Sequence, residues 1–305
     1  KGPTGAYRGA GGPESAFCME RTMDLVAREL SMDPVEIRRK NFISPDAFPY
    51  QTATGLTYDS GDYGKSLDLA LEMSDYYGWQ EKARLSTETG GPLIGVGVST
   101  VVKMAGAAGE VRTEDAWITI DSGGKVTART GISPHGQGSD VCMAQVVADQ
   151  LGISPSNIQV LHGDTDVVPS GGGTGATRGT VVGTSAMYTV AEKARRKLSR
   201  IASHLMDCPE SDIVFEEGRI YSQLAPDCAK TFAEIASAAY SEELLPPDVE
   251  VGLDFQDRFT LSVPYYNPHS FATHVVVVEV NRDTGHVKII KYVGIHDCGR
   301  IINPM

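Results

Sequence analysis

Two glycine-rich segments, each followed directly by a predicted helix, are the residues best placed to do chemistry in this chain. The first, SPHGQGSD (133–140), precedes an apolar run over 141–151, and the second, SGGGTGATRGT (170–180), precedes a run over 181–198. The first turn of a helix has unsatisfied backbone N–H groups and the positive end of the helix dipole, so it can bind phosphate without a charged side chain. The two segments therefore predict a large phosphorylated cofactor that spans two helix N-termini.

Ordinary turns are the alternative interpretation of the same residues. The chain has 33 glycines, and many of them must only end strands or make turns. Neither segment contains the Gly-Lys-Ser/Thr of a nucleotide-binding P-loop, and neither is a GxGxxG that opens a βαβ unit. Spacing alone leaves both interpretations open.

Composition narrows the class of protein. With 305 residues, of which 41% are hydrophobic and 22% charged, the chain is typical of a soluble globular protein of one large or two ordinary domains. The net charge of −12 and the lack of a basic tract argue against nucleic-acid binding. We find no apolar run long enough for a membrane span. Five scattered cysteines without CxxC spacing favour neither a disulfide framework nor a zinc or iron–sulfur site, so we expect reduced thiols and a cytoplasmic location.

The N-terminal elements are predicted to be helical. Pro13 begins a helix, and its apolar residues should pack on a core: Ala16, Met19, Met23, Val26 and Leu30. A short helix over 35–41 should expose Arg38, Arg39 and Lys40 to solvent. Residues 44–64 form a loop or short hairpin whose aromatic side chains cover the core or line a substrate path. A helix follows over 65–77, and the polar stretch 84–91 is interpreted as a domain boundary.

Beyond this stretch the pattern changes to the two-residue alternation of strands. We predict strands over 94–101, 116–120, 126–130, 158–162, 213–215, 272–280 and 287–296, with hairpins after 120 and after 280. We predict helices over 181–206 and over 232–240, the latter capped by Thr231. The small-residue loop 104–110 suits a pocket wall. This order favours α+β layers and not a regular βαβ repeat.

Six segments, in order along nearly the whole chain, resemble the molybdopterin-binding large subunit of the xanthine dehydrogenase family: AYRGAGGPE, MDPVEIRRKNFI, SPHGQGSD, HGDTD, GATRGTVVGTSA and DCGRIINP. That family includes aldehyde oxidoreductases (aldehyde oxidases), the aerobic-type carbon monoxide dehydrogenase large chain and 4-hydroxybenzoyl-CoA reductase. The resemblance implies an α+β fold of layered mixed sheets with packed helices. Residues 1–85 would be the C-terminal part of the first molybdenum-binding domain, and residues 86–305 most of the second.

The resemblance also implies which residues meet the cofactor. Gly136, Gln137 and Gly138 would lie beside the molybdenum and the pterin. The phosphate end would be held by Ala176, Thr177, Arg178, Gly179 and Thr180, with the arginine able to bind a pyrophosphate bidentately. The AYRG loop would place Tyr7, Arg8 and Gly9 at the catalytic centre, where Arg8 can stabilise negative charge on a substrate oxygen. Alternatively, Arg8 pairs with a carboxylate, and Gln137 only starts a helix.

The cofactor implied is molybdopterin cytosine dinucleotide with molybdenum. The partners implied are the rest of the large subunit, a small iron–sulfur subunit, a medium FAD subunit and a small organic substrate, which is hydroxylated at an electron-poor carbon. The pterin sulfurs hold the metal, so no protein ligand is expected, and His135 and His162 are interpreted as turn residues. Asp164 and Asp166 should be turn and capping residues, and Cys298 buried and inert.

Departures from the family pattern limit these expectations. Gly9 stands where carbon monoxide dehydrogenase has a cysteine, so oxidation of CO is disfavoured. The family's general-base glutamate, in a GxGE-type motif, is absent from this chain, and Glu110 resembles at best a pocket-wall position. Both ends look cut, so we expect a fragment that is inactive by itself. The alternatives are a cofactor-free scaffold or assembly module of the same fold, and a reductase of aromatic acyl-CoA within the family.

Overall fold

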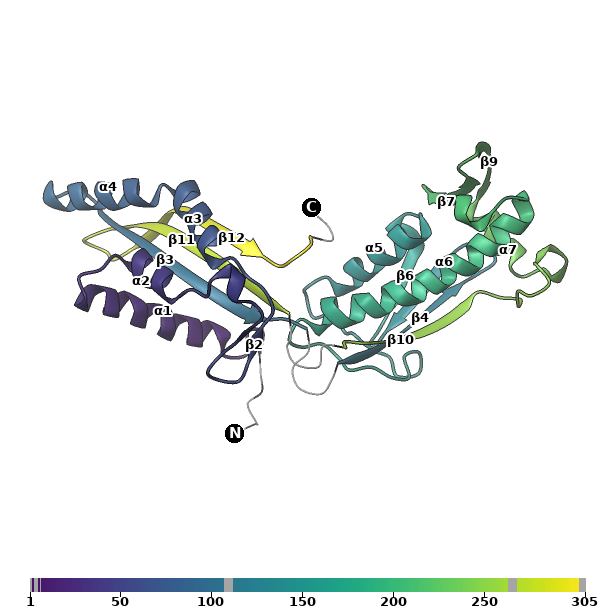
Figure 1. Ribbon diagram of the computed structural model, residues 1–305, viewed down its shortest axis with the longest axis horizontal. Helices are drawn as coiled ribbons and strands as arrows, with labels where there is room; N and C mark the ends of the chain where they lie inside the picture. Colours follow the sequence, from purple (N-terminus) through teal and green to yellow (C-terminus); the bar gives the residue numbers. More distant parts are fainter. Residues whose placement is uncertain (1, 3–4, 6, 107–111, 263–267, 302–305) are drawn as a thin grey trace. The chain divides into compact units, whose positions relative to one another are not determined.

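The computed structural model describes residues 2, 5, 7–106, 112–262 and 268–301, arranged in two compact units (Figure 1). Unit 1 combines Lys1–Met104 with Tyr265–Met305, and unit 2 is Ala105–Pro264. The chain thus leaves unit 1, builds unit 2 and returns. These borders differ from a division at residue 85, and the assignment of 1–85 and 86–305 to two molybdenum-binding domains stays a prediction.

Unit 1 is built around a three-stranded antiparallel sheet of order β12–β11–β3. Its helices are α1 (Gly12–Glu29), α2 (Pro34–Asn41), α3 (Tyr63–Ser74) and α4 (Tyr76–Glu88), with a 3₁₀ turn at Pro45–Ala47. Its strands are β1 (Tyr50–Gln51), β2 (Thr57–Tyr58), β3 (Leu93–Met104), β11 (His269–Val280) and β12 (Val287–Asp297). Helix α3 packs on β11 and β12, and α4 packs on β3. The β11–β12 hairpin and the small β1–β2 hairpin confirm the predictions for these segments.

The polar stretch 84–91, interpreted as a domain boundary, begins inside α4, which ends at Glu88. Its role as a boundary stays a prediction. Arg84 pairs with Glu81 and Glu88 at 2.6 Å each, one turn away on either side. Pairs at these spacings support a helix that has few apolar residues. The residue that separates α3 from α4 is Asp75, which has a left-handed φ of 57°.

Helix α1 forms as predicted, but most of its apolar residues are not buried. Met19 is 62% exposed and Leu30 is 60% exposed, and within the helix only Ala27 is fully buried. The helix covers the free edge of β3, where the Glu20 carboxylate accepts from the backbone N–H of Thr100 at 3.1 Å. The expectation that this apolar stripe packs on a core is therefore wrong for the described residues.

Arg38 corrects a second expectation, because it is one of the most buried side chains of unit 1 and not part of a solvated face. It is 2% exposed and pairs with Glu20 at 2.8 Å and Asp24 at 2.9 Å. Two carboxylates from α1 thus neutralise a guanidinium from α2, which ties the two helices together. The pattern of α2 gave no signal for this partnership, since the acids lie 14 and 18 residues away.

Unit 2 is built around a four-stranded mixed sheet of order β10–β4–β5–β6. Its strands are β4 (Thr113–Ile120), β5 (Val126–Thr130), β6 (Ile158–Leu161), β7 (Ile213–Glu216), β8 (Arg219–Ser222), β9 (Ala225–Thr231) and β10 (Asp254–Thr260). Its helices are α5 (Ser139–Leu151), a π-helical turn (Gly179–Thr184), α6 (Ser185–Met206) and α7 (Phe232–Ala238), with 3₁₀ turns at Pro155–Asn157, Glu210–Asp212 and Glu242–Leu244. Strands β5 and β6 are parallel, and α5 is the crossover between them.

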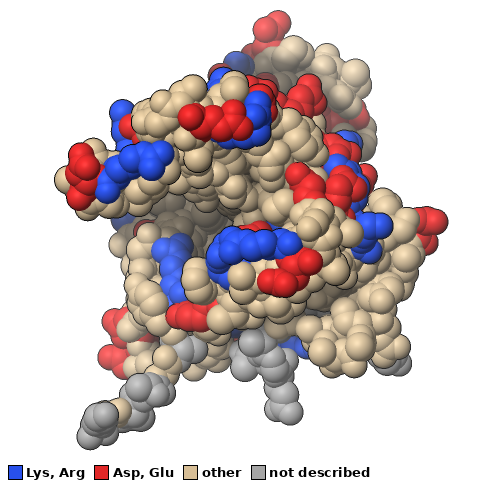
Figure 2. All heavy atoms as spheres, turned by 90° about the vertical axis from the view of Figure 1, so that its left-hand side faces the viewer, with Lys and Arg blue, Asp and Glu red and all other residues tan. Residues whose placement is uncertain are grey.

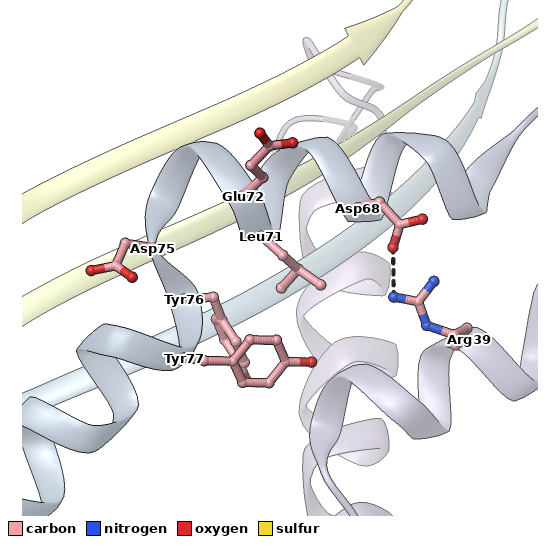
Figure 3. Close-up of a pocket in the computed structure, with 7 residues that line it drawn as sticks. All are labelled: Arg39, Asp68, Leu71, Glu72, Asp75, Tyr76 and Tyr77. Atoms are coloured by element: carbon pink, nitrogen blue, oxygen red, sulfur yellow. Dashed lines mark hydrogen bonds and ion pairs between the residues drawn. The ribbon is translucent and has the colours of Figure 1, made fainter.

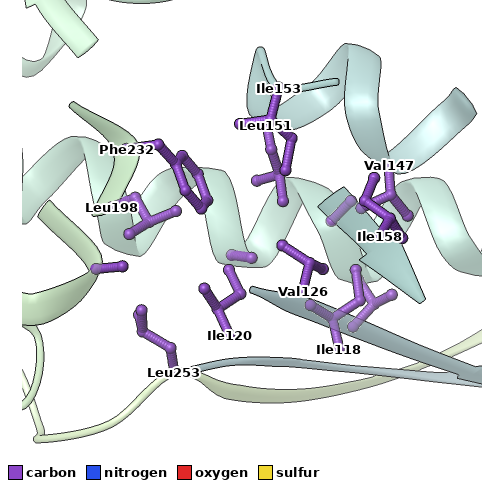
Figure 4. Close-up of a cluster of buried hydrophobic side chains, with 14 of the residues drawn as sticks. Ile118, Ile120, Val126, Val147, Leu151, Ile153, Ile158, Leu198, Phe232 and Leu253 are labelled. Atoms are coloured by element: carbon purple, nitrogen blue, oxygen red, sulfur yellow. The ribbon is translucent and has the colours of Figure 1, made fainter. Parts of the chain in front are cut away.

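The core of unit 2 lies between this sheet and helices α5 and α6 (Figure 4). Ile118 and Ile120 of β4 and Val126 of β5 face the helices, as two-residue alternation requires. Helix α6 contributes a continuous buried stripe at three- and four-residue steps: Met187, Val190, Ala191, Ala194, Leu198 and Ile201. These mixed sheets with packed helices confirm the predicted α+β class.

Three strands of unit 2 were not predicted. Strands β8 and β9 complete a second, three-stranded sheet of order β7–β8–β9, and β10 lies at the edge of the main sheet. Strand β9 contains Pro226, which is tolerated in edge strands. Strand β10 has only two apolar residues, Phe255 and Phe259, and therefore no hydrophobic run. The helix over 232–238 begins as predicted, with a capping box between Thr231 and Glu234.

Candidate functional site

The first glycine-rich segment lies between β5 and α5, where the crossover helix begins. Gly136 and Gly138 have left-handed φ angles of 104° and 73°, and Gly138 is the N-cap of α5. The side-chain oxygen of Gln137 accepts from the backbone N–H of His135 at 2.7 Å. Among the described residues, no heavy atom lies within 4 Å of the position a Cβ would take on either glycine. The loop is thus open on its outer side and directs a helix start outward.

The second segment leads into α6 through strained backbone. Ala176 and Thr177 have positive φ angles of 44° and 61°, which residues with side chains seldom adopt. They are followed by the π-helical turn Gly179–Thr184. Consecutive strained residues and single π-turns both occur preferentially at functional sites. This loop therefore has the features of a ligand-binding segment.

The structure brings the two segments together; we call residues 131–138 and 171–180 the loop pair. Thr174 donates its hydroxyl to the carbonyl of Ser133 at 2.7 Å and accepts from the Ser133 N–H at 3.1 Å. Gly131 and Gly171 approach so closely that a Cβ on Gly131 would lie 2.3 Å from the Cα of Gly171. Two helix starts consequently lie side by side, as the prediction of one cofactor spanning both requires.

A third segment reaches the loop pair at Thr177. The buried backbone N–H of Gly106 donates to the Thr177 hydroxyl at 3.3 Å. This glycine belongs to the loop predicted as a pocket wall; residues 107–111 of that loop, including Glu110, lie outside the described residues. The described end of the loop thus touches the predicted cofactor segment.

The Arg178 side chain does not reach outward, which corrects the expectation of a bidentate contact with a pyrophosphate. Its guanidinium is 5% exposed and pairs at 2.7 Å with Glu114, whose carboxylate is fully buried. It also donates to the carbonyls of Thr113, at 2.6 Å, and of Gly173. Arg178 therefore supports the loop from inside the unit.

Asp115, next to Glu114 on β4, holds the start of the second segment. It accepts from Arg258 at 2.7 Å and from the Ser170 hydroxyl at 2.6 Å. The hydrogen bonds from Arg258 and Ser170 keep the pKa of the Asp115 carboxyl below its usual value, so the carboxylate stays ionised at neutral pH. Sequence reasoning missed both acids, because acidic residues at the start of a strand usually face solvent.

The AYRG loop lies in unit 1, immediately before α1. Three consecutive residues have positive φ angles, Gly9 at 97°, Ala10 at 48° and Gly11 at 84°. Tyr7 is 87% exposed and Arg8 is exposed. Within the part of the chain that the structure describes, Arg8 makes no ion pair. A purely structural pairing of Arg8 with a carboxylate is thus absent there, and its catalytic role stays a prediction.

The remaining candidate residues do not come together in a site. Asp164 makes a turn, since its carboxylate accepts from the Asp166 N–H at 2.9 Å. Cys298 is exposed, so the expectation of a buried thiol was wrong. In residues 7–106, 112–262 and 268–301, no group of three or more His, Cys, Asp and Glu side chains is placed to hold a metal ion.

Unit 1 has two hollows that could offer an alternative site. One, of about 370 Å³, lies between α2, α3 and α4 and is edged by the Arg39–Asp68 ion pair (Figure 3). Another, of about 270 Å³, includes Tyr58 and Tyr63 among its mainly apolar lining. In that hollow the Tyr63 ring packs edge-on against Phe42, Phe48 and Phe271, so it belongs to the core. None of the residues predicted to bind cofactor lines either hollow.

On the face drawn in Figure 2, lysine and arginine lie interspersed with aspartate and glutamate. In the described residues, no helix combines the length and the apolar character that crossing a membrane requires.

Comparison with known proteins specifies the family to which this chain belongs. Models described as molybdopterin cofactor-binding domain match residues 69–305 and 1–42. The chain therefore belongs to the xanthine dehydrogenase family of molybdopterin-binding large subunits.

Relatives align along almost the whole chain. The carbon monoxide dehydrogenase large chain of Hydrogenophaga pseudoflava is 35% identical over 306 residues, 96% of this chain and 37% of the relative. The nicotine 6-hydroxylase large subunit of Paenarthrobacter nicotinovorans is 33% identical over 317 residues, 100% of this chain and 38% of the relative. This chain thus spans well under half the length of these relatives.

Solved structures agree with the fold. Quinoline 2-oxidoreductase from Pseudomonas putida 86 superposes with a TM-score of 0.85 at 30% identity, covering all of this chain and 39% of that one. A Cu,Mo-CO dehydrogenase superposes with a TM-score of 0.80 at 30% identity, covering 95% of this chain and 38% of that one.

Proposed function

We propose that this chain binds a molybdopterin dinucleotide at the loop pair and forms part of the large subunit of a molybdenum-dependent oxidoreductase. The observation that carries the proposal is the side-by-side placement of two helix starts, tied through Ser133 and Thr174, with left-handed backbone at Gly138 and Thr177. The pyrophosphate of a dinucleotide lies between the pterin and the nucleoside, so it needs hydrogen-bond donors from both helix starts.

The residues of the loop pair suit an anionic ligand. Neither 131–138 nor 171–180 contains an aspartate or glutamate, and the first acidic residue of α5 is Asp140, in its first turn. The nearest buried carboxylate, Glu114, is neutralised by Arg178 at 2.7 Å. Gly136 and Gly138 leave space beside the backbone, and the exposed residues Thr177 and Thr180 add hydroxyl groups. An anion beside residues 131–138 and 171–180 would therefore meet N–H and O–H donors.

Each loop has its own task in this proposal. Gly136, Gln137 and Gly138 would face the pterin, while Ala176, Thr177, Gly179 and Thr180 would hold the phosphate end through backbone and hydroxyl donors. The cofactor, when bound, supplies two-electron redox chemistry at molybdenum, and the protein supplies binding and orientation. Tyr7, Arg8 and Gly9 would lie near the reacting atoms, where Arg8 stabilises negative charge on a substrate oxygen.

We propose a small organic substrate and not CO, although a carbon monoxide dehydrogenase is among the relatives. Gly9 has a φ of 97°, and a Cβ there would lie 2.9 Å from the Pro13 side chain. A cysteine at this position would strain the turn and collide with α1. Relatives named as hydroxylases of nicotine and oxidoreductases of quinoline act on small organic rings, which agrees with this choice.

We further propose cytosine as the nucleobase of the dinucleotide and the cytoplasm as the location. We propose a small iron–sulfur subunit and a medium FAD subunit as partners. The names of the relatives support partner subunits, since they are a large chain and a large subunit. Reduction of an aromatic acyl-CoA and a cofactor-free scaffold remain the competing functions, with no described residue that favours either.

Two glycines offer a matched test. Gly138 has a φ of 73° and Gly285, in the β11–β12 turn, a φ of 72°, and a Cβ on either would touch no described residue within 4 Å. Gly138→Ala and Gly285→Ala should strain the backbone equally. In the complete large subunit with its partners, we expect only Gly138→Ala to lose the CMP that acid releases from the cofactor. Equal CMP in both variants would contradict the proposed site.

A further inference from the structure

We infer that four residues inside unit 2 set the separation between the two halves of the loop pair and so act as positioning residues for the dinucleotide. They are Gly131, Gly171, Glu114 and Arg178, and we call this group of contacting residues the crossing. This inference rests on the proposed function, because the ligand is the one proposed for the loop pair. None of these four side chains needs to touch that ligand.

The first element of the crossing is a backbone contact that only glycine permits. A Cβ on Gly131 would lie 2.3 Å from the Gly171 Cα, and a Cβ on Gly171 would lie 2.4 Å from the Gly131 Cα. Neither residue has the left-handed φ that ordinarily explains a glycine. Both are therefore required by the close approach of the two segments, and that approach brings the two helix starts together.

The second element is the Glu114 carboxylate, which is placed against both glycines. Its Oε1 would lie 2.5 Å from a Cβ on Gly131 and 3.1 Å from one on Gly171. Its Oε2 accepts from the backbone N–H of Gly172 at 3.1 Å and from Arg178 at 2.7 Å. One carboxylate from β4 thus contacts the start of the first segment and binds two points of the second.

The third element is the onward connection through Arg178. Its guanidinium donates to the carbonyl of Gly173 within the loop and to the carbonyl of Thr113 on β4. The loop is therefore fastened to the sheet at Gly172, at Gly173 and at Arg178. Since the Cα of Arg178 directly precedes the π-helical turn, this fastening also sets where α6 begins.

The Glu114–Arg178 pair includes a buried oxygen that costs folding stability, so a contribution to stability does not explain why the pair is present. Oε1 of Glu114 is buried and, among the described residues, has no hydrogen-bond partner. An unsatisfied buried carboxylate oxygen lowers stability, and an apolar pair of similar shape would fold at least as well. Retaining the ion pair is consistent with a requirement for the loop spacing itself, because Oε1 takes the space that a Cβ on Gly131 or Gly171 would need.

The first test changes the contact and leaves the charges. We expect Gly131→Ala to speed loss of the dinucleotide from the complete enzyme by about 10- to 100-fold, the range typical of supporting residues around a bound centre. The control is Gly97→Ala on β3, where a Cβ meets no atom of the described chain within 4 Å and φ is not left-handed. Retention by Gly131→Ala equal to that of the control would overturn the inference.

The second test separates positioning from stability. Glu114→Gln alone leaves a buried guanidinium without its counter-charge, so it should lower both the unfolding midpoint and dinucleotide retention. Adding Arg178→Gln removes that charge and should restore the midpoint, but retention should stay low because the shorter side chain no longer fastens the loop. Recovery of retention together with the midpoint would show a merely structural role and overturn the inference.

A readout that needs no cofactor keeps the two claims distinct. Hydrogen exchange of the peptides covering 131–140 and 171–182 should be faster in Gly131→Ala than in the wild type, in both segments at once. Unchanged exchange would overturn the crossing. Absence of dinucleotide from the wild-type enzyme would instead overturn the proposed function, whatever the exchange shows.

Discussion

Arg38 and Arg39 are neighbours on α2 whose environments are opposite. Arg38 is buried between Glu20 and Asp24 of α1. Arg39 pairs at 2.7 Å with Asp68 at the rim of a surface depression (Figure 3), where both side chains are more than a third exposed. Two arginines of one helix thus make different kinds of ion pair, which is buried for Arg38 and exposed for Arg39.

We predict that Arg38→Met lowers the free energy of unfolding by about 3–5 kcal/mol, because two acidic side chains lose a buried partner. Arg39→Met should lower it by less than about 1 kcal/mol, as is usual for exposed pairs. Urea denaturation of both variants measures the difference. Equal losses would contradict the account of the α1–α2 contact.

Arg8 differs from both, because it is exposed and has no ion pair among the described residues. We predict that Arg8→Ala leaves the unfolding midpoint unchanged and lowers kcat of the complete enzyme by about 10²–10³-fold, the usual cost of removing one group that stabilises charge in a transition state. Steady-state kinetics with a small organic substrate would check this. A folded enzyme with full activity would show that Arg8 is not catalytic.

At the scale of elements, the hairpin of β11 and β12 holds a pair of histidines. The rings of His274 and His296 are 4.8 Å apart, and His274 Nδ1 lies 2.9 Å from the Tyr292 hydroxyl. Burial first, and the neighbouring His296 second, lower the pKa of His274 below its ordinary value. Glu20 and Asp24 of α1 line the same hollow as His274 and Tyr292.

This arrangement predicts that unit 1 loses stability in acid. Because the folded pKa of His274 is below the unfolded value of about 6.5, the unfolded chain binds more protons as the pH falls through that value, and folding becomes less favourable. His274→Gln should reduce the difference between unfolding midpoints at pH 7.5 and at a pH of about 5. His286→Gln, at the exposed hairpin turn, is the control. An unaltered difference in His274→Gln would contradict this assignment.

Local patterns were sufficient to predict most elements and the loop pair, but not the residues that hold it. Glycines before apolar runs predicted the helix starts at Gly138 and Gly179, because those signals lie within a few residues of each other. Glu114 lies more than fifty residues before its partners, and nothing in TEDAWITI indicates a buried carboxylate. The same limit explains why Arg38 was expected in solvent and the Arg178 side chain at the ligand.

At the scale of the whole molecule, the order of elements hides the division into units. Strand β11 returns to pair with β3, and β12 pairs with the other edge of β11, so unit 1 contains both ends of the chain. A boundary predicted from a polar stretch could not reveal this, since the pairing of β3 with β11 joins residues more than 150 positions apart. The resemblance over six ordered motifs identified the family where local patterns left the topology open.

The central claim is that this chain belongs to a large subunit that holds a molybdenum dinucleotide cofactor. The most direct measurement is the content of molybdenum, by mass spectrometry, and of acid-released nucleotide in the complete large subunit purified with its partner chains. We predict molybdenum and CMP in amounts equal to the large subunit. A well-folded assembly that contains neither would contradict the claim and favour a scaffold of the same fold.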